Sequence, residues 1–186
     1  MSIAIEIKNR YTGAVLYTHK TTEKRQASGF AIRDALEAAC KADADLIGAD
    51  LTGTNLYGVK LTYADLCGAL LTGTNLYGVN LTGTNLYGVN LTDAKVRSHQ
   101  LVGERPYLQI GPIGSRCAQM TLWITKDGPY IQTGCFFGTR AQFEAAVNAE
   151  HGANKHGKEY TAALALIDAH TSLWTPAEVQ AEKGAA

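Results

Sequence analysis

The sequence has no excess of charge, because its 17 lysines and arginines balance its 17 aspartates and glutamates. A neutral chain is poorly suited to broad electrostatic capture of nucleic acid or of anionic membranes. No apolar run is long enough to span a bilayer. The first residues also lack the basic segment and apolar core of a secretion signal. We therefore expect a cytoplasmic protein without membrane contact and without direct nucleic-acid binding.

Motifs of known chemistry are scarce as well. The cysteines form neither a Cys-x-x-Cys pair nor a disulfide framework, which is typical of reduced cytoplasmic thiols. They are Cys40, Cys67, Cys117 and Cys135. His151 and His156 have no third ligand at a set spacing, so we expect no metal. Neither a nucleophile elbow nor a phosphate loop with lysine is present. We expect no catalytic residue, no cofactor and no enzyme activity, with the last point left open for the C-terminal segment.

A repeated phrase dominates the middle of the chain. LTGTNLYGVN fills residues 71–80 and again 81–90, and LTGTNLYGVK fills residues 51–60. The phrase contains a period of five, in which leucine recurs at every fifth position from Leu46 to Leu91. A small residue lies two positions before each leucine, Asp or Asn directly before most of them, and Gly two positions after most. A repeat this strict decides the fold of its segment.

A period of five excludes both regular structures. In an α-helix, successive leucines would lie about 140° apart and would form no apolar stripe. In a flat strand, the leucine five positions further on would face the opposite side. All leucines can point inward only if the chain turns a corner after each unit, where glycine tolerates the unusual φ angle. Four corners close a square, so we expect stacked coils of 20 residues, about 4.8 Å apart.

The pattern ADLIG-ADLTG-TNLYG resembles the A(D/N)LXX motif of the pentapeptide repeat proteins. The resemblance covers eleven units over residues 44–98 and implies a mainly β fold, the right-handed quadrilateral β-helix with leucines inside. The last units are less regular, which indicates that the coil ends near residue 98. Residues 1–43 and 99–186 are then predicted to be separate parts of the chain.

Residues 1–43 are predicted to be a β-hairpin and a helix that cap the coil. Ile3, Ile5 and Ile7 alternate with polar residues as in a strand. Residues 23–42 have the pattern of one helix that follows a threonine N-cap. Its predicted apolar side consists of Phe30, Ala31, Leu36 and Ala39.

Residues 99–186 are predicted to be a small α+β domain. A hairpin is expected with Asp127-Gly128 at its turn. Thr139 and Gln142 form the capping-box pattern of a helix that ends near Glu150. A second helix should follow, and a short last helix should start after Thr175-Pro176. The apolar positions of the second helix are Tyr160, Leu164, Ile167 and Leu173.

Residues 20 apart should stack on the outer faces of the coil. Tyr57 is then expected beneath Tyr77, with Asn55 beneath Asn75, and Tyr87 lies on the opposite side above Cys67. Tyrosine is favoured at interfaces, so Tyr57, Tyr77, Tyr87, Asn55 and Asn75 are the candidate binding residues of this face. The alternative is that these columns only stabilise cross-strand pairing.

The C-terminal domain offers a second candidate site. The residues of this site could converge on a small anionic or nucleotide ligand, with Phe136 or Phe137 stacking against a base. They are Arg116, Phe136, His151, Lys155, His156 and Tyr160. The alternative is that these residues have ordinary structural roles at helix ends, at the surface and in the core.

The leader IEIKNRYTGAVLYT and the C-terminal segment resemble those of phage and prophage pentapeptide proteins. The resemblance implies a non-enzymatic binding protein that engages a host protein in the bacterial cytoplasm and inhibits host defence. Other family members mimic DNA and bind gyrase, but the short, nearly neutral coil predicted here fits that role poorly. An uncovered coil end leaves homo-oligomers open.

Overall fold

The computed structural model describes residues 2–184 and divides into two compact units, Met1–Ser98 and His99–Ala186. The hairpin, the first helices and the repeats all belong to the first unit, so the boundary expected after residue 43 stays a prediction. Within residues 2–184, no helix combines the length and the apolar character needed to cross a membrane.

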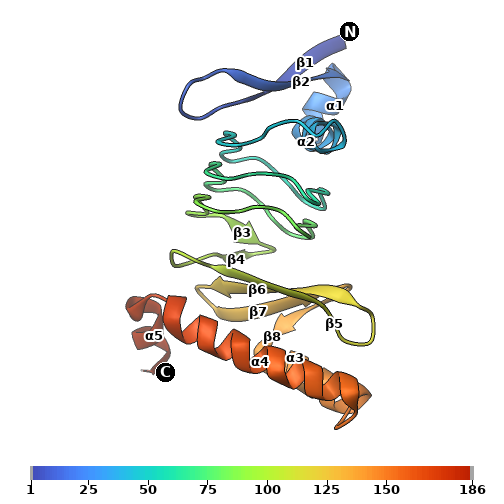
Figure 1. The fold of residues 1–186 in the computed structure, drawn as a ribbon. Helices are drawn as coiled ribbons and strands as arrows, with labels where there is room; N and C mark the ends of the chain where they lie inside the picture. The colour runs from blue at the N-terminus through green and yellow to red at the C-terminus, as the bar shows by residue number, and fades with distance from the viewer. Residues whose placement is uncertain (1, 185–186) are drawn as a thin grey trace. The chain divides into compact units, whose positions relative to one another are not determined.

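The first unit begins with an antiparallel hairpin of β1 (Ser2–Lys8) and β2 (Val15–Thr22), as the sequence predicts (Figure 1). Asn9 closes the connection, because its backbone N–H donates to the carbonyl of Ala14 at 2.8 Å. Of the alternating isoleucines, Ile7 is fully buried. The hairpin therefore turns one row of apolar side chains toward the rest of the unit.

The single helix predicted over residues 23–42 is wrong. The structure has two helices, α1 (Glu23–Ala27) and α2 (Ala31–Lys41). Gly29 separates them with a φ angle of +74°, a left-handed conformation that ends a helix and that glycine adopts without strain. Thr22 is the N-cap of α1, and its hydroxyl accepts the backbone N–H of the third helical residue.

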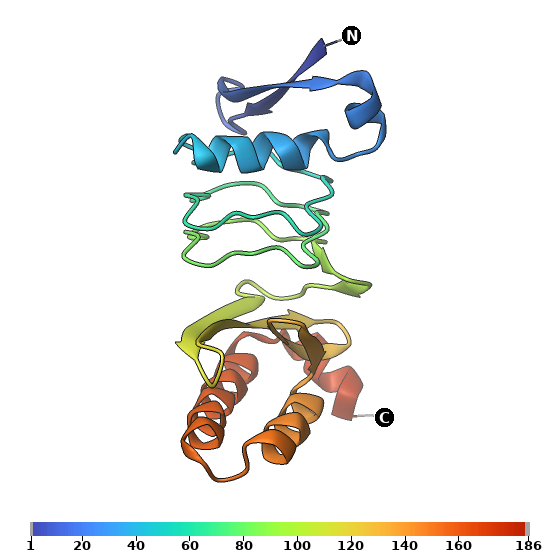
Figure 2. The same cartoon turned by 90° about the vertical axis from the view of Figure 1, so that its right-hand side faces the viewer.

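Helix α2 lies along the first layer of the repeats and covers it, as Figure 2 shows. Its buried side consists of Ala31, Ala35, Leu36 and Ala39. The prediction was right for three of its four positions, since Phe30 is the N-cap of α2 and is only partly buried. A coil end exposes unpaired strand edges and leucine side chains, which the small apolar face of this helix removes from water.

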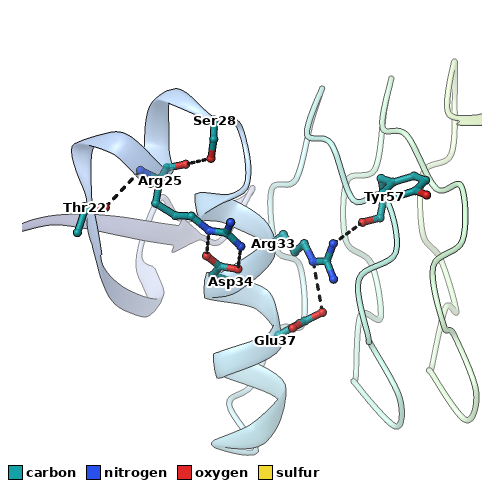
Figure 3. A network of polar contacts seen from close by, with 7 residues as sticks. All are labelled: Thr22, Arg25, Ser28, Arg33, Asp34, Glu37 and Tyr57. Atoms are coloured by element: carbon teal, nitrogen blue, oxygen red, sulfur yellow. Dashed lines mark hydrogen bonds and ion pairs between the residues drawn. The ribbon is translucent and has the colours of Figure 1, made fainter.

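Two arginines fasten the helices in place (Figure 3). The guanidinium of Arg25 forms a two-pronged ion pair with Asp34, through Nε at 2.5 Å and Nη2 at 2.7 Å. Arg33 donates from Nη1 to the backbone carbonyl of Tyr57 at 3.2 Å and lies 3.6 Å from a carboxylate oxygen of Glu37. The first pair joins α1 to α2, and the second arginine joins α2 to the repeats.

The repeats stack with a period of 20 residues. Parallel bridges join Asp50 to Leu70, Asn55 to Asn75 and, in the last layer, Asn75 to Lys95. The ten leucines at every fifth position from Leu46 to Leu91 are all buried, none more than 8% exposed, whereas Leu70, which lies outside this period, is only partly buried. The predicted 20-residue register and inward leucines are confirmed. Four five-residue units therefore make one layer.

Each five-residue unit turns at a left-handed residue. The eight glycines that follow the leucines have φ angles between +65° and +70°. Tyr63 and Asp93, which stand where the pattern expects glycine, adopt φ angles of +60° and +57°. The corner conformation is thus imposed by the ladder, and glycine is the residue that adopts it at least cost.

The second unit contains a four-stranded antiparallel sheet in the order β5-β6-β7-β8. Strand β3 (Lys95–Val96) belongs to the first unit. The strands of the second unit are β4 (His99–Gln100), β5 (Tyr107–Ile113), β6 (Ala118–Thr125), β7 (Gly128–Thr133) and β8 (Phe136–Thr139). The predicted hairpin turn at Asp127-Gly128 joins β6 to β7. Strand β8 is a separate strand that the sequence pattern did not predict.

Three helices follow the sheet: α3 (Arg140–Glu150), α4 (Lys155–Trp174) and α5 (Ala177–Gly184). Both arms of the predicted capping box are present at the start of α3. Helices α3 and α4 cover one face of the sheet (Figure 2). The core between them includes Met120, Leu122, Ile131, Phe143, Tyr160, Leu164 and Ile167. Leu173, predicted as a core position, is 75% exposed.

We predict that Asp34→Asn destabilises the first unit at neutral pH. The hydrogen bonds and charge of Arg25 hold the pKa of the Asp34 carboxyl below its usual value. A carboxyl whose folded pKa is lowered stabilises the fold above its unfolded pKa, about 3.9, and loses that contribution as the pH falls through the folded value. The stability difference between the two proteins should therefore be present at pH 7 and shrink below about pH 4.

Thermal unfolding of both proteins across this pH range, followed by circular dichroism, measures the difference. Glu23→Gln makes a matched single-charge change on α1 and should have little effect. Equal stability of the wild-type protein and Asp34→Asn at pH 7 would contradict the role given to this ion pair.

Candidate functional site

The first candidate surface is a column of stacked rings on the repeats. The rings of Tyr57 and Tyr77 lie with centroids 5.3 Å apart and an interplanar angle of 50°. The guanidinium of Arg97 lies over the ring of Tyr77, 4.7 Å from its centroid. We call Tyr57, Tyr77 and Arg97 the tyrosine column. Sequence reasoning placed the two tyrosines correctly but missed Arg97, although it stands 20 positions after Tyr77.

A ladder of amides runs beside the tyrosine column. Asn75 donates from Nδ2 to Oδ1 of Asn55 at 3.2 Å, as stacking 20 residues apart requires. The same oxygen of Asn55 accepts the backbone N–H of Tyr57 at 3.1 Å. These amides thus fix the backbone that carries the tyrosines. Both side chains take part in hydrogen bonds between and within the stacked layers. This supports the alternative that Asn55 and Asn75 stabilise cross-strand pairing and do not bind a partner.

Tyr87 belongs to another side of the repeats. Its backbone carbonyl accepts the N–H of Gly68 at 2.8 Å, so it stacks above Cys67 as predicted. Its side chain is 80% exposed, against 47% for Tyr57. The three predicted tyrosines therefore do not form one surface.

Charge is divided between the sides of the repeats. Because units four apart stack, the eleven units over residues 44–98 fall into four columns, each beside the next along the chain. The acidic residues all lie in the first two columns: Asp45 and Asp65, then Asp50 and Asp93. The basic residues all lie in the other two: Lys95 and Arg97, then Lys60.

All seven of these charged residues are exposed. The near neutrality of the segment therefore conceals an acidic half and a basic half. Arg10 partly offsets the acidic half, since it donates to the carbonyl of Gly68 at 3.3 Å, whereas Arg33 near the basic half is beside Glu37. The sequence contained this signal, because applying the 20-residue register to the charges is enough to find it.

The second candidate site is a cavity of about 320 Å³ in the C-terminal unit. Four of the six residues predicted for a ligand site line it: Arg116, Phe136, His151 and Tyr160. They come from the β5–β6 turn, the start of β8, the end of α3 and the first half of α4. Ligand binding there stays a prediction, but the residues do come together.

Aromatic rings form the apolar part of the cavity. Phe136 meets Phe143 edge to face with centroids 5.2 Å apart, and Phe143 meets Tyr160 in the same way at 5.5 Å. The imidazole of His151 lies nearly parallel to the ring of Tyr160, with centroids 5.7 Å apart. Such contacts are favourable beyond the burial of area, so these walls are well defined.

Polar groups surround the cavity opening. Ser115, Arg116 and Glu150 are exposed, and His151 is partly buried. The hydroxyl oxygen of Ser115 lies 3.4 Å from Nε2 of His151. A carboxylate oxygen of Glu150 lies 3.8 Å from the same nitrogen, so serine, histidine and glutamate do not form a relay through both ring nitrogens.

The turn that carries Ser115 and Arg116 is fixed to α4. The backbone N–H of Gly114 donates to Oε2 of Glu159 at 2.7 Å. Gly114 has a φ angle of +71°, and a Cβ there would lie 1.9 Å from the hydroxyl of Tyr160. Only glycine leaves room for the tyrosine that forms one wall.

Lys155 and His156 do not line the cavity. Lys155 is the exposed first residue of α4. His156 contacts His151, with ring centroids 5.8 Å apart, and so lies behind a lining residue. Among the side chains that the structure describes, in residues 2–180, no group of three or more His, Cys, Asp or Glu is arranged to hold a metal ion.

Two histidines outside both candidate sites, His99 and His170, pack against other groups of the C-terminal unit. His170 is 7% exposed, and its Nε2 lies 3.1 Å from the carbonyl oxygen of Arg105. His99 stacks on Tyr130 with centroids 4.0 Å apart, and its Nδ1 lies 2.6 Å from a carboxylate oxygen of Asp127. No spacing rule in the sequence indicates either contact, because the partners lie 28 or more positions away.

We predict that Gly114→Ala destabilises the C-terminal unit more than Gly134→Ala. Both alanines would adopt a left-handed conformation, which costs about 1 kcal/mol or more. At Gly134 the added Cβ would meet only Nη1 of Arg116, at 3.7 Å, whereas at Gly114 it would overlap Tyr160. Trp123 and Trp174 are the two tryptophans of the chain, so tryptophan fluorescence in urea reports on this unit alone. Equal losses for the two variants would contradict the packing of Tyr160 on the turn.

Comparison with known proteins supports the interpretation of the middle segment as pentapeptide repeats. The family model of pentapeptide repeats matches residues 42–73 and 60–98. A comparison with curated proteins gives no significant match. Among solved structures, the chain is similar to HetL, a pentapeptide repeat protein involved in heterocyst differentiation regulation from the cyanobacterium Nostoc sp. strain PCC 7120. The identity is 43% with a TM-score of 0.26, over 26% of this chain and 21% of HetL. Residues 42–98 are therefore a segment of pentapeptide repeats.

Proposed function

We propose that the repeats wind into a right-handed quadrilateral β-helix that serves as a non-enzymatic scaffold for docking a protein partner. The observation that carries the proposal is the tyrosine column, in which Tyr57, Tyr77 and Arg97 stack on one side of the repeats. Tyrosine and arginine are enriched among the residues that contribute most to protein interfaces. A square coil would present them on one flat face.

The rigidity of the ladder favours binding by this surface. The backbone beneath the column is held on both sides, since the N–H of Leu56 donates to the carbonyl of Asn75 and the N–H of Gly58 to that of Tyr77. Little backbone entropy is therefore lost when a partner docks. The rings also support each other, so their side chains lose less freedom than isolated surface tyrosines would.

The division of charge suggests the kind of partner. Lys95 and Arg97 share the column of the tyrosines, and Lys60 lies in the next column. A protein surface with carboxylates would be complementary to this basic half, which would speed association and orient the partner. DNA mimicry fits less well, because the four acidic residues of the segment lie on one half only.

The likeness of the leader to phage proteins extends the proposal to a partner from a bacterial host and to inhibition of a host defence. This extension rests on that likeness alone, whereas the docking surface rests on the side-chain arrangement. Capture from bacterial lysate tests both, because the captured protein is identified.

We predict that Tyr57→Ala combined with Tyr77→Ala weakens partner capture at least tenfold. The double variant removes both rings and the aromatic face under Arg97 while the ladder, which is made by the backbone, remains. The immobilised full chain is incubated with lysate, the retained protein is identified, and its affinity is then measured with purified material at low and high salt. Binding should weaken as salt increases.

Tyr87→Ala is the matched control, because Tyr87 is 80% exposed but lies in a column of the acidic half, away from the tyrosine column. It should leave capture unchanged. Circular dichroism verifies that both variants keep the fold. Equal capture by the double variant and by the wild-type protein would overturn the proposed docking surface.

A further inference from the structure

We propose that the cavity of the C-terminal unit binds a small ligand with a ring-sized apolar body and a single anionic group, such as an aromatic carboxylate or a monophosphate ester. This inference is independent of the docking surface on the repeats. The cavity holds about 320 Å³, near the lower end of the roughly 300–1,000 Å³ typical of ligand pockets. Its size suits one ring with a short polar extension.

The apolar part of the cavity sets the body of the ligand. Phe143, Val147 and Tyr160 are 4–7% exposed and belong to the core of the unit, and Phe136 packs against them. A preformed apolar surface of this kind gains most from an apolar group that replaces poorly bound water. Ring faces and edges are both present, since Phe136 and Tyr160 each meet Phe143 edge to face.

The polar opening sets the charge of the ligand. Arg116 is the one permanent cation that lines the cavity, and no carboxylate among the side chains described in residues 2–180 forms an ion pair with it. A guanidinium binds a carboxylate or a phosphate through two parallel hydrogen bonds. The hydroxyl of Ser115 and the imidazole of His151, 3.4 Å apart, can add one more hydrogen bond.

The residues at the opening also limit how much negative charge the ligand can carry. Glu150 lies at the same opening and repels further negative groups. Lys155, which would have supplied a second cation, does not line the cavity. A nucleoside triphosphate would place several charges beside one arginine and one glutamate, which is unfavourable. The structure therefore narrows the anionic or nucleotide ligand expected from the sequence to a compact molecule with one anionic group.

The cavity is preorganised, because its walls are fixed without a ligand. The hydrogen bond from Gly114 to Glu159, at 2.7 Å, fixes the turn of Ser115 and Arg116 to α4. On α4, Gly157 approaches so closely that a Cβ there would lie 2.0 Å from the carbonyl oxygen of Gly152. The loop that follows His151 is thereby packed against the helix that carries Tyr160. Polar and apolar parts of the cavity are thus positioned by the same helix.

The test is to titrate the full chain with benzoate and with phenyl phosphate. Binding is measured by calorimetry and by changes in NMR chemical shifts. Benzyl alcohol is the neutral counterpart of the same size, and ATP is the multiply charged one. We expect saturable binding of at least one of these two probes, each of which carries a single anionic group, at least tenfold weaker binding of benzyl alcohol, and no tighter binding of ATP. The relative affinity of benzoate and phenyl phosphate distinguishes a carboxylate ligand from a phosphate.

Variants locate the site. Arg116→Ala should weaken the preferred probe at least tenfold, and Arg116→Lys should restore part of the affinity. Lys126→Ala, a matched removal of an exposed cation outside the cavity lining, should have no effect. Absence of saturable binding by both benzoate and phenyl phosphate, unchanged affinity in Arg116→Ala, or tighter binding of ATP would each overturn the proposal.

Discussion

The hydrogen-bonded ladder between residues about 20 positions apart is the constraint on which the first unit depends. Backbone amides such as that of Leu61, which donates to the carbonyl of Asn80 at 2.9 Å, fix how far the chain travels before it returns to the same side. The leucines then face inward together, and every outward position gains a neighbour above or below it. Stacked rings, paired amides and separated charges are all consequences of that one register.

The repeats could be predicted from the sequence because their information is local. A period of five, with glycine at the corner, permits few backbone paths, and the left-handed φ angles of Tyr63 and Asp93 show that the path is followed even without glycine. The helix over residues 23–42 was mispredicted for the opposite reason. Its apolar pattern continues through the break, and only the φ angle of +74° at Gly29 divides it.

The cavity shows where residue types alone stop being informative. Arg116, Phe136, His151 and Tyr160 come from four different elements, and their convergence depends on how α3 and α4 pack on the sheet. Lys155 has the same suitable chemistry but a position at the tip of α4 that faces solvent. Similarly, the burial of His170 results from tertiary packing, because nothing in its neighbours distinguishes it from a surface histidine.

Disulfide formation between engineered cysteines tests the register most directly. In a Cys67→Ser background, Thr52→Cys is combined either with Thr72→Cys, 20 positions away, or with Thr62→Cys, only 10 positions away. Gly53 bonds to the carbonyl of Thr72 at 2.8 Å, so the 52–72 pair should be within disulfide reach. Peptide mass spectrometry after mild oxidation should find the 52–72 link at high yield and no 52–62 link. Efficient linkage of 52 to 62 without linkage of 52 to 72 would contradict the stacked 20-residue layers.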